Sequence, residues 1–254
     1  MNAPMSKLAT TPRICHAEHL PGTVAQDARV PVLIVGGGAC GLITALMLHD
    51  AGVDCAVLER DATPLGSSAL SSGFIPAPGT QAQRAAGIDD SPERFAADIS
   101  VKAKGRAAPH LVQAYAQAIG PALDALQERH GLQWQVLDGF LYPGHSVRRM
   151  HATPEKTGVG LMGRLANAVT AADIPLITEA TVRELWVNAQ QHVIGVGYER
   201  PDGTLEHLAC NGFGGNPAMV RELLPEMRDA LFAGHTGNDG SAIRVGWTST
   251  PSAA

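Results

Sequence analysis

The hydrophobic pattern near the start of the chain predicts one βαβ unit. Residues 31–35 form a continuous apolar run, which is typical of a buried parallel strand. After a run of glycines, the apolar residues 42–49 have the length and spacing of a buried helix that ends near Gly52. A second short apolar run, at residues 54–59, predicts another strand. A strand, a glycine turn, a helix and a strand within about 30 residues indicate an α/β fold.

The pattern then changes to a loop that is followed by helices. Residues 62–90 are rich in Gly, Ser, Pro and Ala, and this composition predicts an extended loop. Ser91 and Pro92 predict the start of a helix, because serine caps helices and proline suits their first position.

Two longer helices are expected further along the chain. Apolar residues at helical intervals predict a helix from Pro109 to about Arg129, which residues 120–121, a Gly-Pro pair, bend or divide. An amphipathic pattern predicts another helix over residues 158–172.

Alternating residues later in the chain predict a small antiparallel meander. Residues 201–203, which read Pro-Asp-Gly, are expected to form the turn between its last two strands. A helix is expected to start at residues 216–217. The three predicted strands are residues 181–187, 192–199 and 205–210.

Composition and charge narrow the class of protein. The 45% hydrophobic content and the 28 glycines fit an α/β protein with many tight turns. A net charge of −5 leaves no basic surplus to neutralise phosphates, which argues against binding of nucleic acid. No stretch approaches the roughly 18 apolar residues of a membrane helix. Residues 1–29 lack a compact apolar signal, so a disordered leader and a cytoplasmic location are expected. Four scattered cysteines predict neither a disulfide framework nor a metal site.

The glycine run has the features of a phosphate-binding turn. Residues 36–41 read Gly-Gly-Gly-Ala-Cys-Gly and match the pattern G-x-G-x-x-G. Gly36 permits the tight exit from the strand, Gly38 lets the backbone approach a pyrophosphate, and Gly41 lets the helix pack closely. The helix start also offers N–H groups and a positive dipole end to an anion. Glu59 ends the second strand, where an acid that binds ribose hydroxyls is expected. The dinucleotide itself stays open at this point.

Three blocks of sequence together resemble one family of flavoenzymes. They are residues 35–41, the Leu-Glu-Arg of residues 58–60, and the Gly-Ser-Ser-Ala-Leu-Ser-Ser-Gly of residues 66–73. They resemble the opening of the fumarate reductase and succinate dehydrogenase flavoprotein family, which includes 3-ketosteroid and tricarballylate dehydrogenases. NAD-binding domains rarely follow the acidic strand with such a loop. An NAD-dependent dehydrogenase is therefore the less favoured interpretation, and on composition alone the serine loop also fits a flexible linker.

The resemblance implies a Rossmann-like (GR2-type) FAD-binding domain over residues 30–245. This domain would contain the meander, a helical segment inserted at about residues 90–172, and an incomplete cap region. FAD would be the cofactor, and hydride would pass between flavin N5 and a small carboxylic acid or an enone. The electron-transfer partner is left open. The implied cofactor-binding residues are Gly36, Gly38, Ala39, Cys40, Gly41, Glu59, Arg60, Ser67, Ser68, Ser72, Gly73 and Val182.

A basic segment supplies candidate substrate contacts, although catalytic residues stay unknown. Residues 144–151 contain two histidines and two arginines, and the segment resembles the substrate side of the family. Arginine grips carboxylates and histidine transfers protons near neutral pH, and the reduction of an activated C=C bond needs both functions. His145, Arg149 and His151 are the candidates. A solvated basic loop fits the same pattern equally well.

Two departures from the family bear on activity. The meander runs directly into a glycine-rich turn at residues 211–216, so either residues 205–210 serve as two strands or a central strand is missing. Residues 246–254 no longer match, and the arginine that donates the proton in the family would lie beyond them. A truncated or frameshifted product is therefore expected. The alternative function is a catalytically inactive FAD-binding remnant or a partner subunit.

Overall fold

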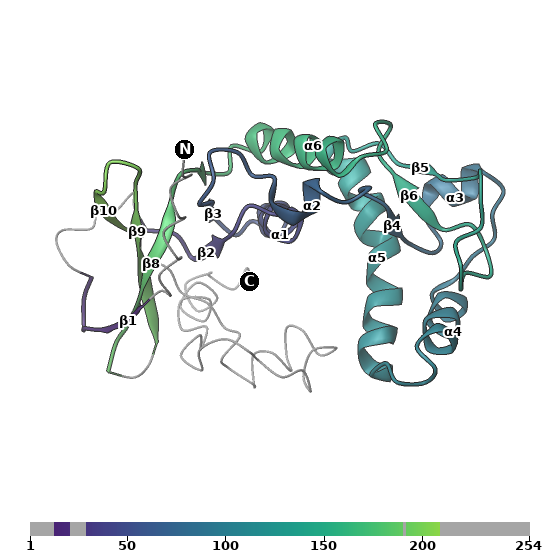
Figure 1. Cartoon of the computed structure of the whole chain (residues 1–254), viewed down its shortest axis with the longest axis horizontal. Coiled ribbons are helices and arrows are strands. Elements are labelled where there is room, and N and C mark those ends of the chain that lie inside the picture. Colours follow the sequence, from purple (N-terminus) through teal and green to yellow (C-terminus); the bar gives the residue numbers. More distant parts are fainter. Residues whose placement is uncertain (1–12, 21–28, 190–191, 209–254) are drawn as a thin grey trace, which may run out of the picture.

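The computed structural model describes residues 13–20, 29–189 and 192–208. Figure 1 shows three groups of elements in a row: a sheet at one end, a parallel sheet with helices in the middle, and further helices with a small sheet at the other end. Within these residues, no helix has the length and hydropathy that a membrane crossing requires. No group of His, Cys, Asp or Glu side chains in the same part of the chain is arranged to hold a metal ion.

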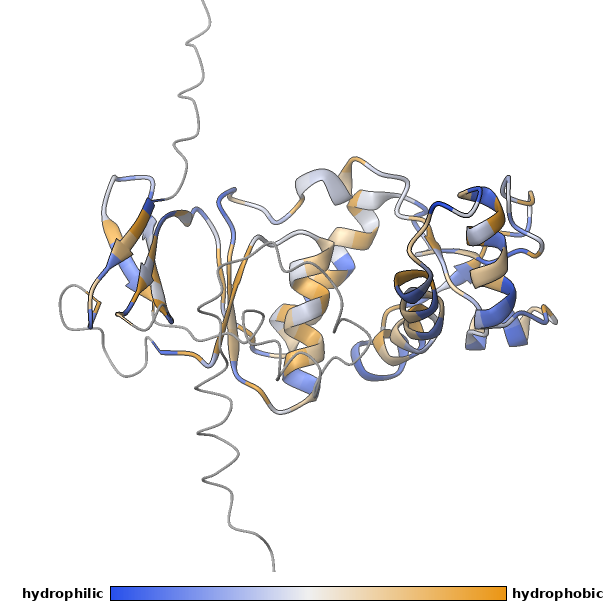
Figure 2. Cartoon of the chain, turned by 90° about the horizontal axis from the view of Figure 1, so that it is seen from below, coloured by the Kyte–Doolittle hydropathy of each residue, from blue (hydrophilic) through white to orange (hydrophobic). Residues whose placement is uncertain are grey.

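The middle layer is a parallel sheet with the strand order β2-β3-β7. β2 (Val32–Val35) and β3 (Cys55–Leu58) are joined by helix α1 (Ala39–Asp50), and β7 (Leu176–Ile177) extends the sheet beyond β3. β3 is fully buried because it lies between the other two strands, which explains its continuous apolar sequence. Hydrophobic residues gather on these strands and on the helix beside them (Figure 2). The predicted βαβ unit is confirmed.

Helix α6 (Gly158–Ala171) covers the same layer, and its bounds agree with the predicted helix. The Thr157 hydroxyl accepts a hydrogen bond from the Gly160 N–H at 3.0 Å and so caps the helix start. Leu161 and Leu165 on its buried face join Leu42 of α1 in the main hydrophobic core. This core fixes the position of α1, and with it the glycine turn at the start of that helix.

The end sheet has the strand order β1-β8-β9-β10, and its last three strands pair antiparallel. The predicted meander and its Gly203 turn are thus confirmed as far as Leu208; the predicted turn at 211–216 and the helix from 216 lie outside the described residues. β1 pairs parallel with β8, so residues 13–16 form a strand, in contrast to the disorder expected for residues 1–29. The sequence gives no local sign of this strand, because its hydrogen bonds come from an edge far along the chain. The strands are β1 (Arg13–His16), β8 (Thr181–Val187), β9 (Val193–Glu199) and β10 (Leu205–Leu208).

The other end, here called the cap region, holds two long helices and a small antiparallel sheet, β4-β6-β5. Helix α5 (Pro109–His130) continues through Pro121, so the expected division at residues 120–121 is wrong. Gly120 packs against the Pro78 carbonyl oxygen so closely that any side chain there would overlap it. This tertiary contact holds the helix where its local sequence predicts a break. The remaining elements are α4 (Pro92–Lys102), which starts after Ser91 as predicted, β5 (Gln135–Val136) and β6 (Met150–Ala152).

The extended loop predicted for residues 62–90 is partly wrong, because the segment contains three short elements. They are α2 (Gly66–Ala69), β4 (Ile75–Pro76) and α3 (Gln81–Ala85). α3 begins with a capping box in which Thr80 and Gln83 bond each other's backbone N–H groups. Its Thr-x-x-Gln signature is present in the sequence, but the surrounding Gly, Pro and Ala obscure it.

Candidate functional site

The predicted phosphate turn has the backbone geometry that its glycines require. Gly36 leaves β2 with a φ of 108°, a conformation that glycine adopts without strain. A methyl group on Gly41 would overlap the Gly36 carbonyl oxygen, so only glycine fits there. Gly38 is the N-cap of α1 and offers no capping side chain of its own, and the first turn of the helix has no acidic residue. The α1 dipole is therefore not offset by a charge within that turn, which suits an anion site.

Glu59 ties the end of β3 to this turn. Its side chain is buried; Oε2 accepts a hydrogen bond from the Gly37 N–H at 2.6 Å, and Oε1 accepts one from the Asp61 N–H at 2.9 Å. A carboxylate oxygen has more than one lone pair, so each can accept a further hydrogen bond. The acid thus supports the turn and keeps acceptor capacity for hydroxyl donors.

The serine loop lies against the start of α1 and the start of α6. The Ser68 hydroxyl accepts a hydrogen bond from the Ala39 N–H at 3.3 Å, and the Gly158 N–H donates to the Ser71 carbonyl at 2.9 Å. Gly73 has a φ of 67° and is buried next to the Thr157 carbonyl, where a side chain would not fit. Two α-helix starts therefore position this loop, which is not a free linker. Within it, the side chains of Ser67 and Ser72 are exposed.

A polar pocket of about 360 Å³ follows directly after Glu59, at the ends of β3, β8 and β9. Arg60 lines it, and its guanidinium lies 3.5 Å from the Asp61 carboxylate. Thr181 and Arg183 also line it, on either side of Val182, whose own side chain packs on the core behind β3. The structure thus brings the consecutive residues Glu59 and Arg60 close to the start of β8, where Val182 lies more than 120 residues later in sequence.

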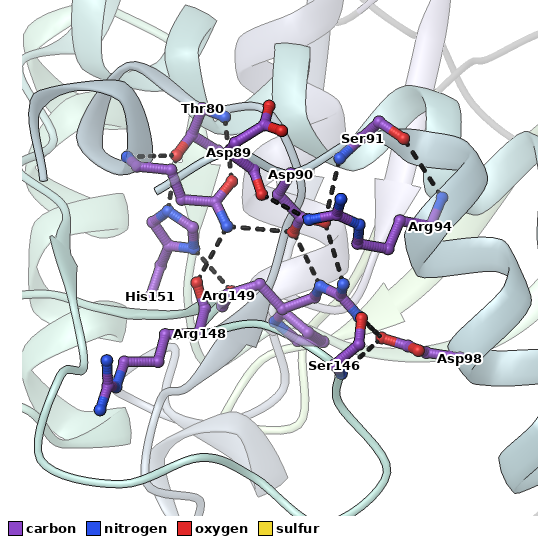
Figure 3. Close-up of polar contacts among 12 residues, drawn as sticks. Thr80, Asp89, Asp90, Ser91, Arg94, Asp98, Ser146, Arg148, Arg149 and His151 are labelled. Carbon is purple, nitrogen blue, oxygen red and sulfur yellow. Dashed lines mark hydrogen bonds and ion pairs between the residues drawn. The ribbon is translucent and has the colours of Figure 1, made fainter. Parts of the chain in front are cut away.

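Arg149, a predicted substrate contact, lies at the centre of a buried ion cluster in the cap region (Figure 3). Its Nε and Nη2 donate to the two Asp90 carboxylate oxygens at 2.8 and 2.9 Å, and its Nη1 donates to Asp98. The guanidinium also lies 4.7 Å from the centre of the Phe95 ring. Burial alone would lower the Arg149 pKa, but hydrogen bonds to the two carboxylates outweigh it and raise the pKa above its ordinary value.

His151 is equally enclosed. Its Nε2 lies 2.7 Å from the Thr80 hydroxyl, and its Nδ1 lies 2.9 Å from the Arg149 carbonyl oxygen. A carbonyl only accepts, so Nδ1 carries the proton and Nε2 accepts from Thr80. Burial lowers the pKa of His151, which keeps the ring neutral near pH 7.

The three candidate substrate contacts therefore have different environments. Arg149 and His151 are fully buried, so the interpretation as a solvated loop is wrong for both. Their contact with substrate stays a prediction, and the structure does not support it because neither side chain reaches solvent. His145 is half-buried beside the Phe95 ring, and burial, followed by the charge of Arg149, lowers its pKa. Their partners Thr80, Asp90 and Asp98 were missed in the sequence, where only the capping motif at Thr80 gives a signal.

Comparisons with known proteins match most of the chain to one family. The FAD binding domain family matches residues 31–250. The NADH:fumarate oxidoreductase of Klebsiella pneumoniae (strain 342) is 26% identical over 233 residues, which cover 88% of this chain and 25% of that protein. The urocanate reductase of Eggerthella lenta is 29% identical over 215 residues, which cover 80% of this chain and 35% of that protein. The chain thus spans between a quarter and about a third of the length of these two curated relatives.

Two solved structures show the same fold. The open conformation of a flavocytochrome c3 fumarate reductase has a TM-score of 0.65 and 24% identity, and the match covers 79% of this chain and 37% of that one. The 3-ketosteroid-Δ4-(5α)-dehydrogenase from Rhodococcus jostii RHA1 has a TM-score of 0.63 and 22% identity, with 88% and 54% covered. The Rossmann-like FAD-binding fold expected from the sequence is therefore confirmed.

Proposed function

Because the chain belongs to the FAD binding domain family, we propose that it works as the cofactor-binding part of an FAD-dependent oxidoreductase. The observation that carries this proposal is the start of α1, which has a glycine N-cap and no acidic residue in its first turn and meets a buried carboxylate at the end of β3. A diphosphate needs N–H donors and positive potential without side chains in the way, and the turn at residues 36–38 offers both. The residues present therefore fit the cofactor.

Each part of the site has its own role in holding FAD. The N–H groups of Gly38 and Cys40 would face the diphosphate at the start of α1, beside the Ala39 N–H, which donates to Ser68. Glu59 would accept hydrogen bonds from ribose hydroxyls with its remaining lone pairs. The polar pocket with Arg60 would take the adenosine end, because it follows directly after Glu59. The serine loop, which is anchored by Ser68 on the Ala39 N–H, would lie along the diphosphate.

The proposed reaction is hydride transfer between flavin N5 and a small carboxylic acid or an enone. When bound, FAD supplies the centre that accepts or donates hydride. Three of the relatives are reductases of fumarate, urocanate and acrylate, which are all acids with a C=C bond next to a carboxylate. We infer the same substrate class here. The contribution of this chain is to bind and orient the cofactor.

A second candidate function is binding of FAD without turnover, as a partner subunit or an inactive remnant. It is favoured by the burial of Arg149 and His151, which leaves these two predicted substrate contacts without exposed surface.

The two functions are separated by one experiment in two stages. The purified chain is mixed with excess FAD and desalted, and the retained flavin is measured by its absorbance. Dye-coupled reduction of fumarate, urocanate and acrylate is then assayed. Retained flavin with turnover supports the oxidoreductase, and retained flavin without turnover supports the second candidate. Folded protein that retains NADH and no flavin would overturn both.

A further inference from the structure

A second cavity lies in the cap region, away from the phosphate turn. It has a volume of about 300 Å³ and opens between α4 and the turn at residues 143–145. Figure 1 shows α4 at the end of the molecule opposite the meander, apart from β2 and α1. A volume of about 300 Å³ is at the lower end of the range found for pockets that bind small molecules. The proposed FAD site uses none of its lining residues.

One face of α4 gives this cavity an apolar wall. Phe95, Ile99 and Ala103 line it and follow each other at intervals of four residues, so they lie above one another on the helix. Phe95 is held from behind by the Arg149 guanidinium and by the Tyr115 ring, which lies 5.7 Å from it. The wall is therefore preformed, and Phe95, which is 2% exposed, supports it from below.

The polar groups at the cavity have partners, with one exception. Asp98 accepts hydrogen bonds from the Ser146 N–H at 2.8 Å and from the Ser146 hydroxyl at 2.9 Å. The Lys102 ammonium donates to the Pro143 carbonyl at 3.3 Å. His145 Nδ1 is buried and has no hydrogen-bond partner within the described part of the chain. A buried polar atom without a partner costs free energy, so a ligand that bonds it would gain that energy back.

The charges at the cavity favour a neutral ligand. Asp98 and Lys102 have opposite charges, and Arg149 further neutralises Asp98. His145 is neutral near pH 7, because burial disfavours its charged form. A neutral imidazole nitrogen accepts or donates one hydrogen bond, and a hydroxyl group can serve it in either case.

We propose that this cavity is a binding site for a small, neutral, ring-bearing molecule with one hydroxyl group, such as a phenol. Its ring packs on Ile99 and Ala103 at the edge of the buried Phe95 ring, and its hydroxyl bonds His145 Nδ1 after the imidazole turns toward the cavity, because this nitrogen is buried in the free chain. The bound molecule bridges α4 and the 143–145 turn, two segments that are also joined through Asp98 and Ser146. This site is separate from the FAD site and does not depend on the proposed function.

The test uses the whole chain with 2-naphthol, a fluorescent two-ring phenol. Titration should show saturable binding with a Kd below 1 mM, roughly the affinity of a fragment-sized ligand. Ala103→Trp fills the cavity and should weaken binding at least about tenfold. The matched control is Val101→Trp on the exposed face of the same helix, where the side chain is 80% exposed. It should change the affinity less than about twofold, because it lies outside the cavity. Circular dichroism establishes that each variant is folded.

A second probe tests the hydrogen bond to His145 Nδ1 without filling the cavity. 2-Methoxynaphthalene keeps the rings and lacks the hydroxyl donor, so it should bind about tenfold more weakly than 2-naphthol, as expected for one lost hydrogen bond in a buried site. His145→Phe keeps a ring at this position and should bring the two probes to equal affinity. Equal affinity of both probes for the unaltered chain would overturn the proposal, as would unchanged binding to Ala103→Trp.

Adding FAD to the titration distinguishes a failure of this inference from a failure of the proposed function. If 2-naphthol occupies the cap cavity, saturating FAD should leave its affinity within about twofold, because the two sites are separate. Displacement of 2-naphthol by FAD would place the probe in the flavin site and refute the inference. A chain that binds 2-naphthol but retains no flavin would refute the proposed function alone.

Discussion

The phosphate turn and the cap ion cluster are both rich in chemistry, but they use their polar groups in opposite ways. At the turn, the donors are backbone N–H groups at a helix start with a glycine N-cap, where the Ala39 N–H makes one long bond, 3.3 Å, to the Ser68 hydroxyl. In the cap region, Arg149 and His151 are paired with Asp90, Asp98 and Thr80 and have no exposed surface. A cluster of charged residue types therefore does not identify a site by itself. What distinguishes a site is polar groups that the protein leaves without an internal partner.

Removing Arg149, the central cation of the ion cluster in the cap region, should cause the largest loss of stability. Arg149→Met leaves Asp90 and Asp98 as carboxylates without their buried partner. We expect a loss of about 3–5 kcal/mol in the free energy of unfolding, the cost of an uncompensated buried charge. Urea unfolding, followed by circular dichroism, measures it.

The control is an ion pair of the same type at the surface. Arg164 pairs with Glu155 at 2.7 Å, with both side chains partly exposed, so Arg164→Met should cost about 0–1 kcal/mol. Equal losses in the two variants would mean that Arg149 is not part of a buried structural cluster.

The next largest effect is expected at the turn. Gly41→Ala places a methyl group onto the Gly36 carbonyl oxygen, so the turn must shift. We expect a loss of about 1–3 kcal/mol in stability, as for other overpacked sites, together with loss of FAD retention. Thermal melting and flavin absorbance after desalting measure the two effects.

Gly163→Ala in α6 is the matched control, because its methyl group meets no atom within 4 Å. Alanine is a better helix former than glycine, so this variant should gain about 0.5–1 kcal/mol. Full retention of FAD by Gly41→Ala would contradict the close packing that we assign to this glycine.

Removing a buried hydroxyl in the cap region should destabilise the protein more than removing one at the surface. Thr80→Val keeps the shape but removes the oxygen that bonds His151 and caps α3. Two buried partners then lose a hydrogen bond, and we expect about 1–3 kcal/mol of destabilisation. Thr170→Val removes an exposed hydroxyl that donates to the Ala166 carbonyl, and should stay within about 0.5 kcal/mol. If chemical denaturation gives the same value for both, Thr80 does not anchor His151.

The two histidines of the cap region should make stability depend on pH. Burial lowers the pKa of His151 and of His145 below the ordinary value of 6.5. Between 6.5 and the lower folded pKa, the unfolded chain binds protons that the folded chain does not. Stability is thus fully present above pH 6.5 and falls below it, by up to about 1.4 kcal/mol per pH unit for each histidine. Denaturant unfolding from pH 7.5 down to about pH 5.5, above the range where carboxylates titrate, measures the slope.

His145→Phe should reduce the slope of stability against pH by the contribution of one histidine and leave the contribution of His151 unchanged. A slope that is unchanged in this variant would show that His145 titrates in the folded chain as it does in the unfolded one.

The sequence allowed prediction of those parts whose signal is local. The βαβ unit follows from two apolar runs and a glycine pattern, and the position of Glu59 beside the glycine turn follows from its place at a strand end. Gly36 and Gly41 could be identified because the backbone of the turn requires glycine at both positions, and one stretch of sequence forms that turn.

The parts that could not be predicted depend on distant partners. β1 exists because it pairs with β8, more than 160 residues later. Gly120 and Pro121 stay inside one helix, and the Pro78 carbonyl packs closely on Gly120. Arg149 was predicted to contact substrate from its residue type and its neighbours in sequence. Its partners Asp90 and Asp98 could not be recognised, because they lie 59 and 51 residues away in sequence. A sequence pattern shows which charges are present, but not which of them already have partners.

Calorimetric titration with FAD and with riboflavin tests whether the start of α1 binds the diphosphate of FAD. Riboflavin has the same ring system but lacks the diphosphate and the adenosine. We predict that the folded chain binds one FAD and binds riboflavin at least about a hundredfold more weakly, as expected when the anion anchors the cofactor. Equal affinity for the two flavins, or a folded chain that binds neither, would contradict it.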